Sequence, residues 1–344
     1  MPDLSQLPSI DQLLGQEEVQ ALEAYFGRTL TLKALRLVLE NIRQIALQEP
    51  GEIPKYGEII QRAQAWLSSW VSPTLQPVIN ASGVILHTNL GRAPLSSETL
   101  QAIREASRGY SNLEFDLETG KRGKRSIHAS RVLSLLTGSE GGLVVNNNAG
   151  AVLLALAALA QDKNVLVSRT QLVEIGGGFR IPDVMRQSGA YLIEIGTTNR
   201  VHLYDFEESL KTQKIAMVLV AHHSNFKLIG FHSEPSLEEI VDMAHQFDVP
   251  VMHDIGSGAL LDTADYGLGH EPMVQESVVA GCDLVCFSGD KLVGGPQAGI
   301  IIGSEALLKP IRTHPLARAL RADKMALAGV TSNLLHYLKG EAVE

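Results

Sequence analysis

Apolar and polar positions follow two different periods in two parts of the chain. Within residues 1–77 the period is that of a helix, with apolar side chains recurring every three or four positions. The first apolar stripe consists of Leu32, Leu35, Leu39 and Ile42. The basic residues Lys33, Arg36 and Arg43 each fall one position further round, off that stripe. The pattern predicts a small N-terminal helical domain, which either docks a partner or packs on its own core or on a sister subunit; composition alone favours packing.

From Val78 to residue 304 the chain alternates strand-like apolar runs with helical stretches. Strands are expected at 142–145, 164–167, 190–195, 215–221, 250–253, 283–287 and 299–302. Helical patterns such as 151–160 and 236–247 lie between several of them. This order predicts an α/β fold with a mostly parallel central sheet covered on both faces. Beyond about residue 305 the pattern is helical again.

Composition narrows the class of protein. With 344 residues and 45% hydrophobic content, the chain can bury a large core. No window approaches the roughly 18 uninterrupted apolar residues of a membrane span, and the start lacks a signal-peptide pattern, so we expect a cytoplasmic protein without a membrane partner. The net charge of −9 argues against holding nucleic acid by bulk charge, so any such contact must be local.

The two cysteines, Cys282 and Cys286, fall within one strand-like run. On a strand, their even separation would point both side chains to one face, too far apart to bond. We expect buried free thiols, and no metal site, because no other ligands lie near them in the sequence.

Lys291 and Asp254 form the most informative pair of residues. Lys291 lies among small residues in the segment 288–299, and Asp254 ends a strand-like run one helix and one strand earlier. Pyridoxal phosphate needs an amine for its aldehyde and an anion beside its ring nitrogen, so this pair predicts that cofactor. A lysine on a surface turn and an aspartate capping a turn are the alternatives, but the glycines around Lys291 favour close approach to a ligand. His253 alternates to the other side of its strand and is interpreted as a packed core histidine.

A phosphate site is predicted where the strand 142–145 runs through small polar residues into a helix. First-turn N–H groups and the helix dipole both favour an anion there. The expected cofactor-binding residues of this loop are Asn147, Asn148, Ala149 and Gly150. Asparagines also cap helices without any ligand, and the two interpretations are equal until Lys291 and Asp254 favour the phosphate. Ser288 is expected as a further phosphate donor.

Arginines near the end of the chain suggest a second anion. Arg318 and Arg321 are three positions apart, which on a helix would place both on one face as a fork for phosphate. A solvated helix face is the alternative. Since pyridoxal phosphate needs only one phosphate pocket, the additional arginines point to an anionic substrate.

Several long motifs together resemble a known family. They are residues 77–95, 146–148, 224–231 and 288–299. These motifs are similar to those of the bacterial selenocysteine synthases, the L-seryl-tRNA(Sec) selenium transferases, and the resemblance covers nearly all of the chain. It implies a fold-type I pyridoxal phosphate transferase, of the aspartate aminotransferase kind, with a small N-terminal helical domain.

The resemblance also implies roles for residues and partners. The cofactor lysine falls on Lys291, the selenophosphate-binding arginines fall on Arg92, Arg318 and Arg321, and Asn225 joins the cofactor-binding set. In the implied reaction, a serine esterified to tRNA displaces Lys291 from the cofactor, water leaves its β carbon, and selenium from selenophosphate is added. Seryl-tRNA(Sec) would dock on the N-terminal helices, and the homo-oligomer would be a ring of dimers.

We interpret the chain as three parts: a tRNA-docking module (1–77), a pyridoxal phosphate-binding domain (78–304) and the start of a truncated C-terminal small domain (305–344), because family members continue beyond this end. One alternative is a related lyase or transferase acting on a free amino acid or sugar acid, although such relatives commonly lack the first helices. Another is a non-catalytic tRNA-binding homologue, which would have no chemical need for Lys291 and Asp254.

Overall fold

The computed structural model describes residues 6–48, 52–175, 178–224 and 226–343. The chain divides into two compact units, Met1–Ile79 and Asn80–Glu344. None of the described helices is both long and apolar enough to cross a lipid bilayer.

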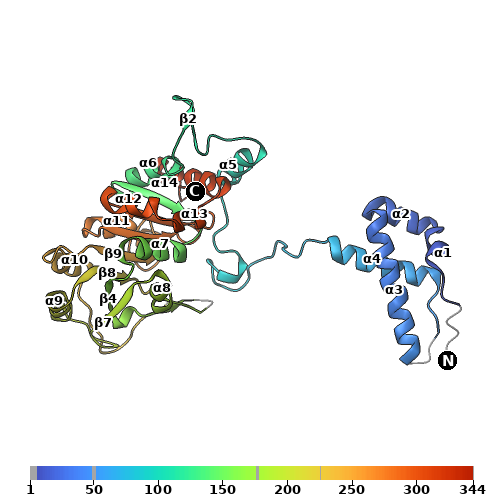
Figure 1. The fold of residues 1–344 in the computed structure, drawn as a ribbon, viewed down its shortest axis with the longest axis horizontal. Coiled ribbons are helices and arrows are strands. Elements are labelled where there is room, and N and C mark those ends of the chain that lie inside the picture. Colours follow the sequence, from blue (N-terminus) through green and yellow to red (C-terminus); the bar gives the residue numbers. More distant parts are fainter. Residues whose placement is uncertain (1–5, 49–51, 176–177, 225, 344) are drawn as a thin grey trace. The chain divides into compact units, whose positions relative to one another are not determined.

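The first unit is helical, as the sequence pattern predicts (Figure 1). Its helices are α1 (Ile10–Leu14), α2 (Glu17–Phe26), α3 (Arg28–Gln48) and α4 (Tyr56–Val71). Of the predicted stripe on α3, Leu35, Leu39 and Ile42 are buried against α2 and α4, and Leu32 is half-buried. The basic residues Lys33, Arg36 and Arg43 are exposed. The unit therefore has a core of its own and a basic outer face on α3.

The second unit is built on a seven-stranded sheet of order β3-β11-β10-β9-β8-β4-β7. Its strands are β3 (Gly141–Val145), β4 (Asn164–Ser168), β7 (Tyr191–Ile195), β8 (Ile215–Ala221), β9 (Val251–Gly256), β10 (Leu284–Ser288) and β11 (Gly299–Gly303). Each corresponds to a predicted strand. Strand β11 runs in the direction opposite to the other six strands of this sheet. The loop 289–298 explains this, since a parallel crossover needs about a dozen or more residues, usually with a helix.

Short elements and helices surround this sheet (Figure 1). The small strand pairs are β1 (Phe115–Asp116) with β2 (Lys121–Arg122) and β5 (Glu174–Ile175) with β6 (Phe179–Arg180). The helices are α5 (Ser97–Arg108), α6 (Ile127–Thr137), α7 (Asn148–Ala160), α8 (Ile181–Ser188), α9 (Leu203–Thr212), α10 (Leu237–His245), α11 (Val274–Val279), α12 (Glu305–Thr313), α13 (Leu316–Ala319) and α14 (Lys324–Lys339). Single 3-10 turns occur at Thr88–Leu90, Arg169–Gln171 and Thr263–Tyr266.

Side chains alternate between two cores, one on each face of the sheet. Val165 and Val167 of β4 belong to the core that includes residues of α7, α8 and α12, whereas Leu166 belongs to the core that includes residues of α6, α9 and α10. Because central strands are covered on both faces, they are apolar throughout. The fold is thus the predicted three-layer α/β architecture.

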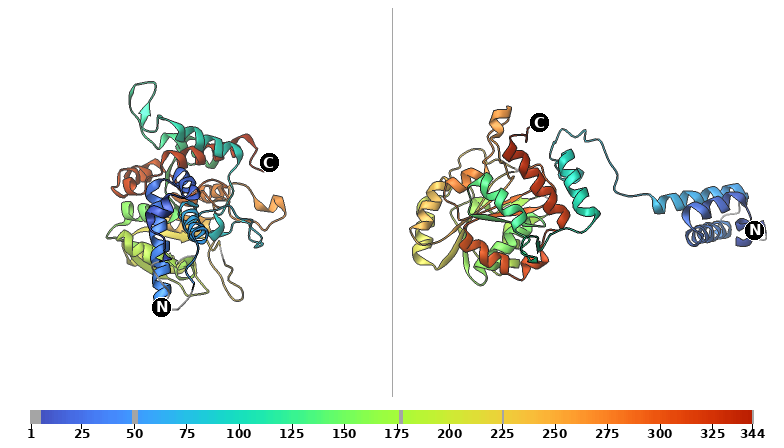
Figure 2. Two further views of the ribbon diagram at one scale, coloured as in Figure 1. Left: turned by 90° about the vertical axis from the view of Figure 1, so that its right-hand side faces the viewer. Right: turned by 90° about the horizontal axis from the view of Figure 1, so that it is seen from above.

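Residues after 304 belong to this second unit. Leu327, Val330 and Leu334 of α14 join the core on the α6 face, and α14 lies alongside α5 (Figure 2). The idea that this segment begins a further small domain stays a prediction.

The prediction for the cysteines is half right. Both thiols are free and buried, but Cys282 packs in the core on the α10 side and Cys286 in the core on the α7 side. The shared face was wrong because β10 begins only at Leu284, so Cys282 lies in the preceding turn and does not follow the strand alternation.

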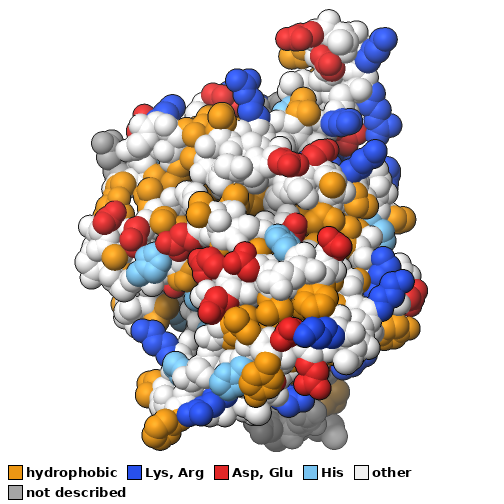
Figure 3. Space-filling model, turned by 90° about the vertical axis from the view of Figure 1, so that its left-hand side faces the viewer, with side chains coloured by type: hydrophobic (Ala, Val, Ile, Leu, Met, Phe, Trp, Pro, Cys, Tyr) orange, Lys and Arg blue, Asp and Glu red, His pale blue; other side chains and the backbone are white. Residues whose placement is uncertain are grey.

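Charges on the second unit are mixed. On the face drawn in Figure 3, acidic and basic side chains are interspersed, and basic ones gather along the hairpin that projects at the top. Strand β2 of this hairpin contributes the exposed Lys121 and Arg122. The chain therefore has local basic surfaces although its net charge is negative.

Candidate active site

A cavity of about 210 Å³ lies at the carboxyl ends of β8, β9 and β10, beside the start of α7. Open α/β sheets place their ligands at this position. The cavity brings together seven of the residues predicted from the sequence: Arg92, Asn147, Asn148, Ala149, Asp254, Ser288 and Lys291. Gly150 does not line this cavity, and Asn225 lies outside the described residues.

Asp254 is a buried carboxylate near the end of β9, with only 6% of its surface exposed. Its Oδ1 accepts a hydrogen bond of 2.8 Å from Asn148 Nδ2 on α7. Burial raises the pKa of Asp254, although the Asn148 bond and the nearby Lys291 amine oppose that rise. A carboxyl group held out of water in this way gains most from a buried cationic partner, such as a protonated ring nitrogen.

Lys291 faces the same space as Asp254. A methyl group placed on Gly256 would lie 3.8 Å from Lys291 Nζ and 3.9 Å from Asp254 Oδ1. Gly256 has a φ of +63°, so the chain turns there in a conformation that other residues rarely adopt. The amine and the carboxyl group therefore meet across one small space, which a side chain at position 256 would fill.

The surroundings of Lys291 favour its neutral amine. Burial lowers the pKa of Lys291, and the Arg92 guanidinium lowers it further, while Asp254, Asp290 and Glu271 oppose the change. Arg92 is held beside the lysine by an ion pair, with 3.3 Å between Arg92 Nε and Asp290 Oδ2. Since only the neutral amine attacks an aldehyde, this environment activates Lys291.

At the start of α7, Asn147 stabilises the helix and Asn148 faces the cavity. Asn147 caps α7, because its Oδ1 accepts the Gly150 N–H at 2.8 Å. The Gly150 N–H is therefore bonded within the protein, which differs from the predicted role of Gly150 in binding the cofactor phosphate. Asn148 Oδ1 is buried without a hydrogen-bond partner in the described chain, so it is an acceptor at the cavity that a ligand donor would satisfy.

These residues fit pyridoxal phosphate. Asp254 suits the ring nitrogen, Lys291 suits the aldehyde, and the N-terminus of α7 with Ser288 suits the phosphate. The unpaired Asn148 oxygen and the buried Asp254 carboxyl are unfavourable unless a polar group enters the cavity.

Comparison with known proteins agrees with this chemistry. Residues 78–344 match the family model described as L-seryl-tRNA selenium transferase, and residues 4–43 match the one described as selenocysteine synthase N terminal. The chain belongs to the L-seryl-tRNA selenium transferase family. A relative from Geotalea daltonii, an L-seryl-tRNA(Sec) selenium transferase, is 49% identical over 336 residues, which cover 97% of this chain and 72% of that protein.

Two solved structures are similar to this chain in fold. D-glucosaminate-6-phosphate ammonia-lyase is 20% identical with a TM-score of 0.60, covering 74% of this chain and 66% of that one. A structure of SPT with PLP as internal aldimine is 15% identical with a TM-score of 0.51, covering 71% and 59%. The predicted fold-type I pyridoxal phosphate architecture is thereby confirmed.

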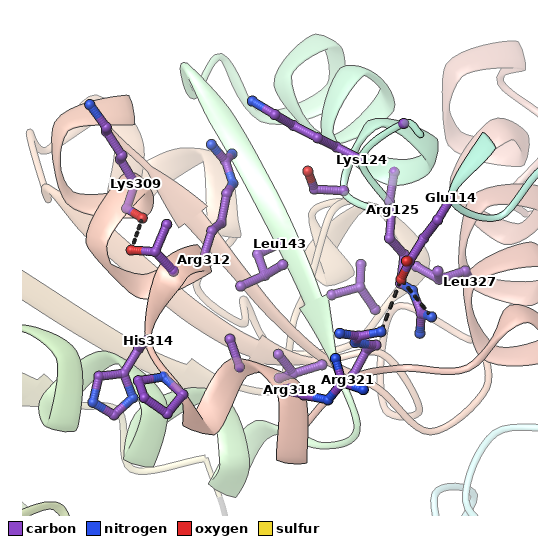
Figure 4. A pocket seen from close by; sticks show the side chains of 18 of the residues that line it. Glu114, Lys124, Arg125, Leu143, Lys309, Arg312, His314, Arg318, Arg321 and Leu327 are labelled. Atoms are coloured by element: carbon purple, nitrogen blue, oxygen red, sulfur yellow. Dashed lines mark hydrogen bonds and ion pairs between the residues drawn. The ribbon is translucent and has the colours of Figure 1, made fainter. Parts of the chain in front are cut away.

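The other two predicted arginines, Arg318 and Arg321, line a second cavity of about 770 Å³ (Figure 4). Arg318 and Arg321 lie there with Arg125 and Arg312, and none of the described residues lines both cavities. Arg321 Nη1 is 2.9 Å from Glu114 Oε1, so this guanidinium already has an anionic partner. The structure thus separates Arg318 and Arg321 from Arg92 within one chain.

The expected shared helix face of Arg318 and Arg321 is wrong. Helix α13 ends at Ala319, and Arg321 forms an isolated bridge with Val145 at the end of β3. The i, i+3 spacing suggested a helix, but pairing with the sheet determines the backbone there.

Sequence reasoning missed the pair formed by His222 and Glu271. His222 directly follows β8 and lines the cofactor cavity, and its Nε2 is 3.2 Å from Glu271 Oε1. The sequence did contain a signal for His222, since it is the first polar residue after the apolar run 215–221. Its partner lies on a long loop that no local period predicts. His253, in contrast, is the predicted core histidine, bonded through Nδ1 to Ser277 Oγ at 2.8 Å, and burial lowers its pKa to about 3.

We expect Arg92→Gln to raise the pKa of Lys291. Arg92 disfavours the lysine cation, so its loss makes protonation easier, and at a fixed pH below the pKa less neutral amine is available. The pH midpoint for capture of pyridoxal phosphate should move up, toward the ordinary lysine value of about 10.4. Absorbance stopped-flow across pH measures this, with Arg169→Gln, an exposed partner of Glu194, as the control. A midpoint that falls would contradict the assigned role of Arg92.

Proposed function

We propose that this chain converts seryl-tRNA(Sec) to selenocysteinyl-tRNA(Sec), with pyridoxal phosphate as cofactor and selenophosphate as selenium donor. The observation that carries the proposal is the cavity in which Lys291 and Asp254 face each other, in a chain that belongs to the selenium transferase family. The cytoplasmic setting and the dimer-based ring expected from the resemblance are part of this proposal.

The predicted residues of the cavity have separate tasks in this chemistry. Bound pyridoxal phosphate supplies an electron-withdrawing ring that makes the serine α proton acidic and its β hydroxyl group expendable. Asp254 holds the proton of the ring nitrogen, and the Asn148 hydrogen bond fixes the carboxylate. Lys291 Nζ, whose pKa is lowered by burial and by Arg92, removes the α proton and returns a proton to the departing hydroxyl group. The first N–H groups of α7 and the Ser288 hydroxyl bind the cofactor phosphate.

The arginines bind the selenium donor in this proposal. A small multiply charged anion suits guanidinium groups, which present paired donors. Arg92 lines the cofactor cavity, whereas Arg318 and Arg321 line the basic second cavity. The homo-oligomer expected for this family offers a way to unite them, with Arg92 from one copy and the other two from a second copy.

Selenium transfer with purified protein, seryl-tRNA(Sec) and selenophosphate tests the function. We expect selenocysteinyl-tRNA(Sec) from the wild type, and a loss of about 10²- to 10³-fold in turnover for Arg318→Ala with the cofactor still bound. Arg186→Ala, which removes an exposed ion pair on α8, is the control and should keep full activity. Loss of cofactor colour in Arg318→Ala would show that its role was misassigned.

The same assay tests tRNA docking by the first unit. Lys33, Arg36 and Arg43 are exposed basic residues on the outer face of α3 and suit a phosphate backbone. Replacing all three by glutamine should raise the KM for tRNA and leave cofactor binding unchanged. A charge-matched control replaces the exposed Lys163, Lys211 and Lys214 of the second unit by glutamine. Equal KM values in the two triple variants would refute docking on α3.

A further inference from the structure

Helix α14 presents one face to the loop 289–298 that carries Lys291. The residues concerned, Gly329, Asn333 and Tyr337, are spaced four apart and so lie on the same side of the helix. Asn333 Nδ2 donates to the Val293 carbonyl at 2.6 Å. The Tyr337 hydroxyl is 2.9 Å from the same oxygen and 3.1 Å from the Leu292 carbonyl.

Gly329 completes this face one turn earlier. A methyl group on Gly329 would lie 2.8 Å from Pro296 Cγ, so only glycine allows the helix and the loop to come this close. Three successive turns of α14 therefore touch the loop, from Pro296 back to the residue directly after Lys291.

The two side chains are suited to a fixed position. Asn333 is 6% exposed, and burial raises the pKa of Tyr337 to about 12, so its hydroxyl group remains a donor at neutral pH. The loop needs such support because it is rich in glycine, including Gly289, Gly294 and Gly295, and glycine loses the most conformational freedom on ordering.

We propose that the α14 face of Gly329, Asn333 and Tyr337 is a positioning element for Lys291. By holding the carbonyl groups one and two residues after the lysine, it fixes the backbone from which the amine reaches toward Asp254. Neither Asn333 nor Tyr337 lines the cofactor cavity, so both act through the loop. Displacement of a reacting group by about 1 Å can cost a factor of about 100 in rate. Only the expected effect on kcat rests on the proposed function.

The first test uses the protein without cofactor. Tyr337→Phe removes one hydroxyl group, and Asn333→Ala removes the buried amide. Each should make amide deuterium exchange in residues 289–295 about five- to tenfold faster, as expected for the loss of about one net hydrogen bond. Thr331→Val is the matched control, since on the same helix Thr331 Oγ1 donates to the His128 carbonyl of α6 at 3.2 Å. It should leave exchange in the loop unchanged.

The second test uses the cofactor-loaded protein. Both variants should shift the pH midpoint of the cofactor absorbance band and lower kcat for selenium transfer by about 10- to 100-fold, with an unchanged KM for tRNA. Loop exchange and pH midpoints equal to those of Thr331→Val would overturn the inference. Tyr337→Phe decides the matter if Asn333→Ala does not fold. A wild type that binds no cofactor would instead refute the proposed function, while the exchange experiment would still decide whether α14 holds the loop.

Discussion

Lys291→Ala is expected to give a folded, colourless protein without measurable selenium transfer. Lys291 carries the only lysine amine among the described residues that line the cofactor cavity. Its burial and the Arg92 guanidinium lower its pKa, which favours the neutral, nucleophilic form. The same amine moves the proton from the substrate α carbon, so its loss removes two tasks together. A reduction of about 10⁴-fold or more in turnover is expected when such a group is lost.

Absorbance, borohydride reduction and peptide mapping check this expectation. The wild type should be yellow, and reduction should fix the cofactor to the peptide that contains Lys291. Lys163→Ala, an exposed lysine of the same unit, should remain yellow and active. Cofactor fixed to another lysine would contradict the assignment, and a colourless wild type would favour the non-catalytic homologue. Activity on free serine without tRNA would favour the alternative lyase.

The sheet was predictable because its central strands are buried on both faces. Runs such as 215–221 and 299–302 are apolar throughout, and the structure forms strands β8 and β11 there. Asp254 and Lys291 could be placed together from the sequence, because each follows such a run and the carboxyl ends of parallel strands share one edge.

Other parts of the site depend on contacts that have no local pattern. Arg318 and Arg321 share a spacing of three, yet the bridge between Arg321 and Val145 joins segments far apart in the chain. The α14 contacts with Val293 likewise follow from packing, since an amphipathic helix pattern says which face is buried and not what it meets. The sequence could therefore indicate the reacting groups but not the residues that hold them.

Asp254→Asn is expected to stabilise the cofactor-free protein. Burial raises the pKa of Asp254, so the folded state favours the protonated carboxyl group. The free energy of unfolding that this preference adds at low pH is lost as pH rises through the raised pKa. At neutral pH the wild type thus bears the cost of a buried carboxylate, which the neutral amide avoids. Thermal unfolding should show a higher Tm for the variant at neutral pH and a smaller difference in acid. Asp262→Asn, an aspartate far less buried, should not show this gain.

With cofactor and substrates present, the same variant should be about 10²- to 10³-fold slower in selenium transfer, in line with the loss of one preorganised electrostatic partner in a dry site. Asparagine keeps the shape and can still accept the Asn148 hydrogen bond, but it has no charge to hold the ring nitrogen proton. The colour should persist, because Lys291 still bonds the aldehyde. A protein that is both more stable and much slower would show that the buried carboxylate is retained for chemistry. Full activity in Asp254→Asn would show that the ring does not depend on this residue.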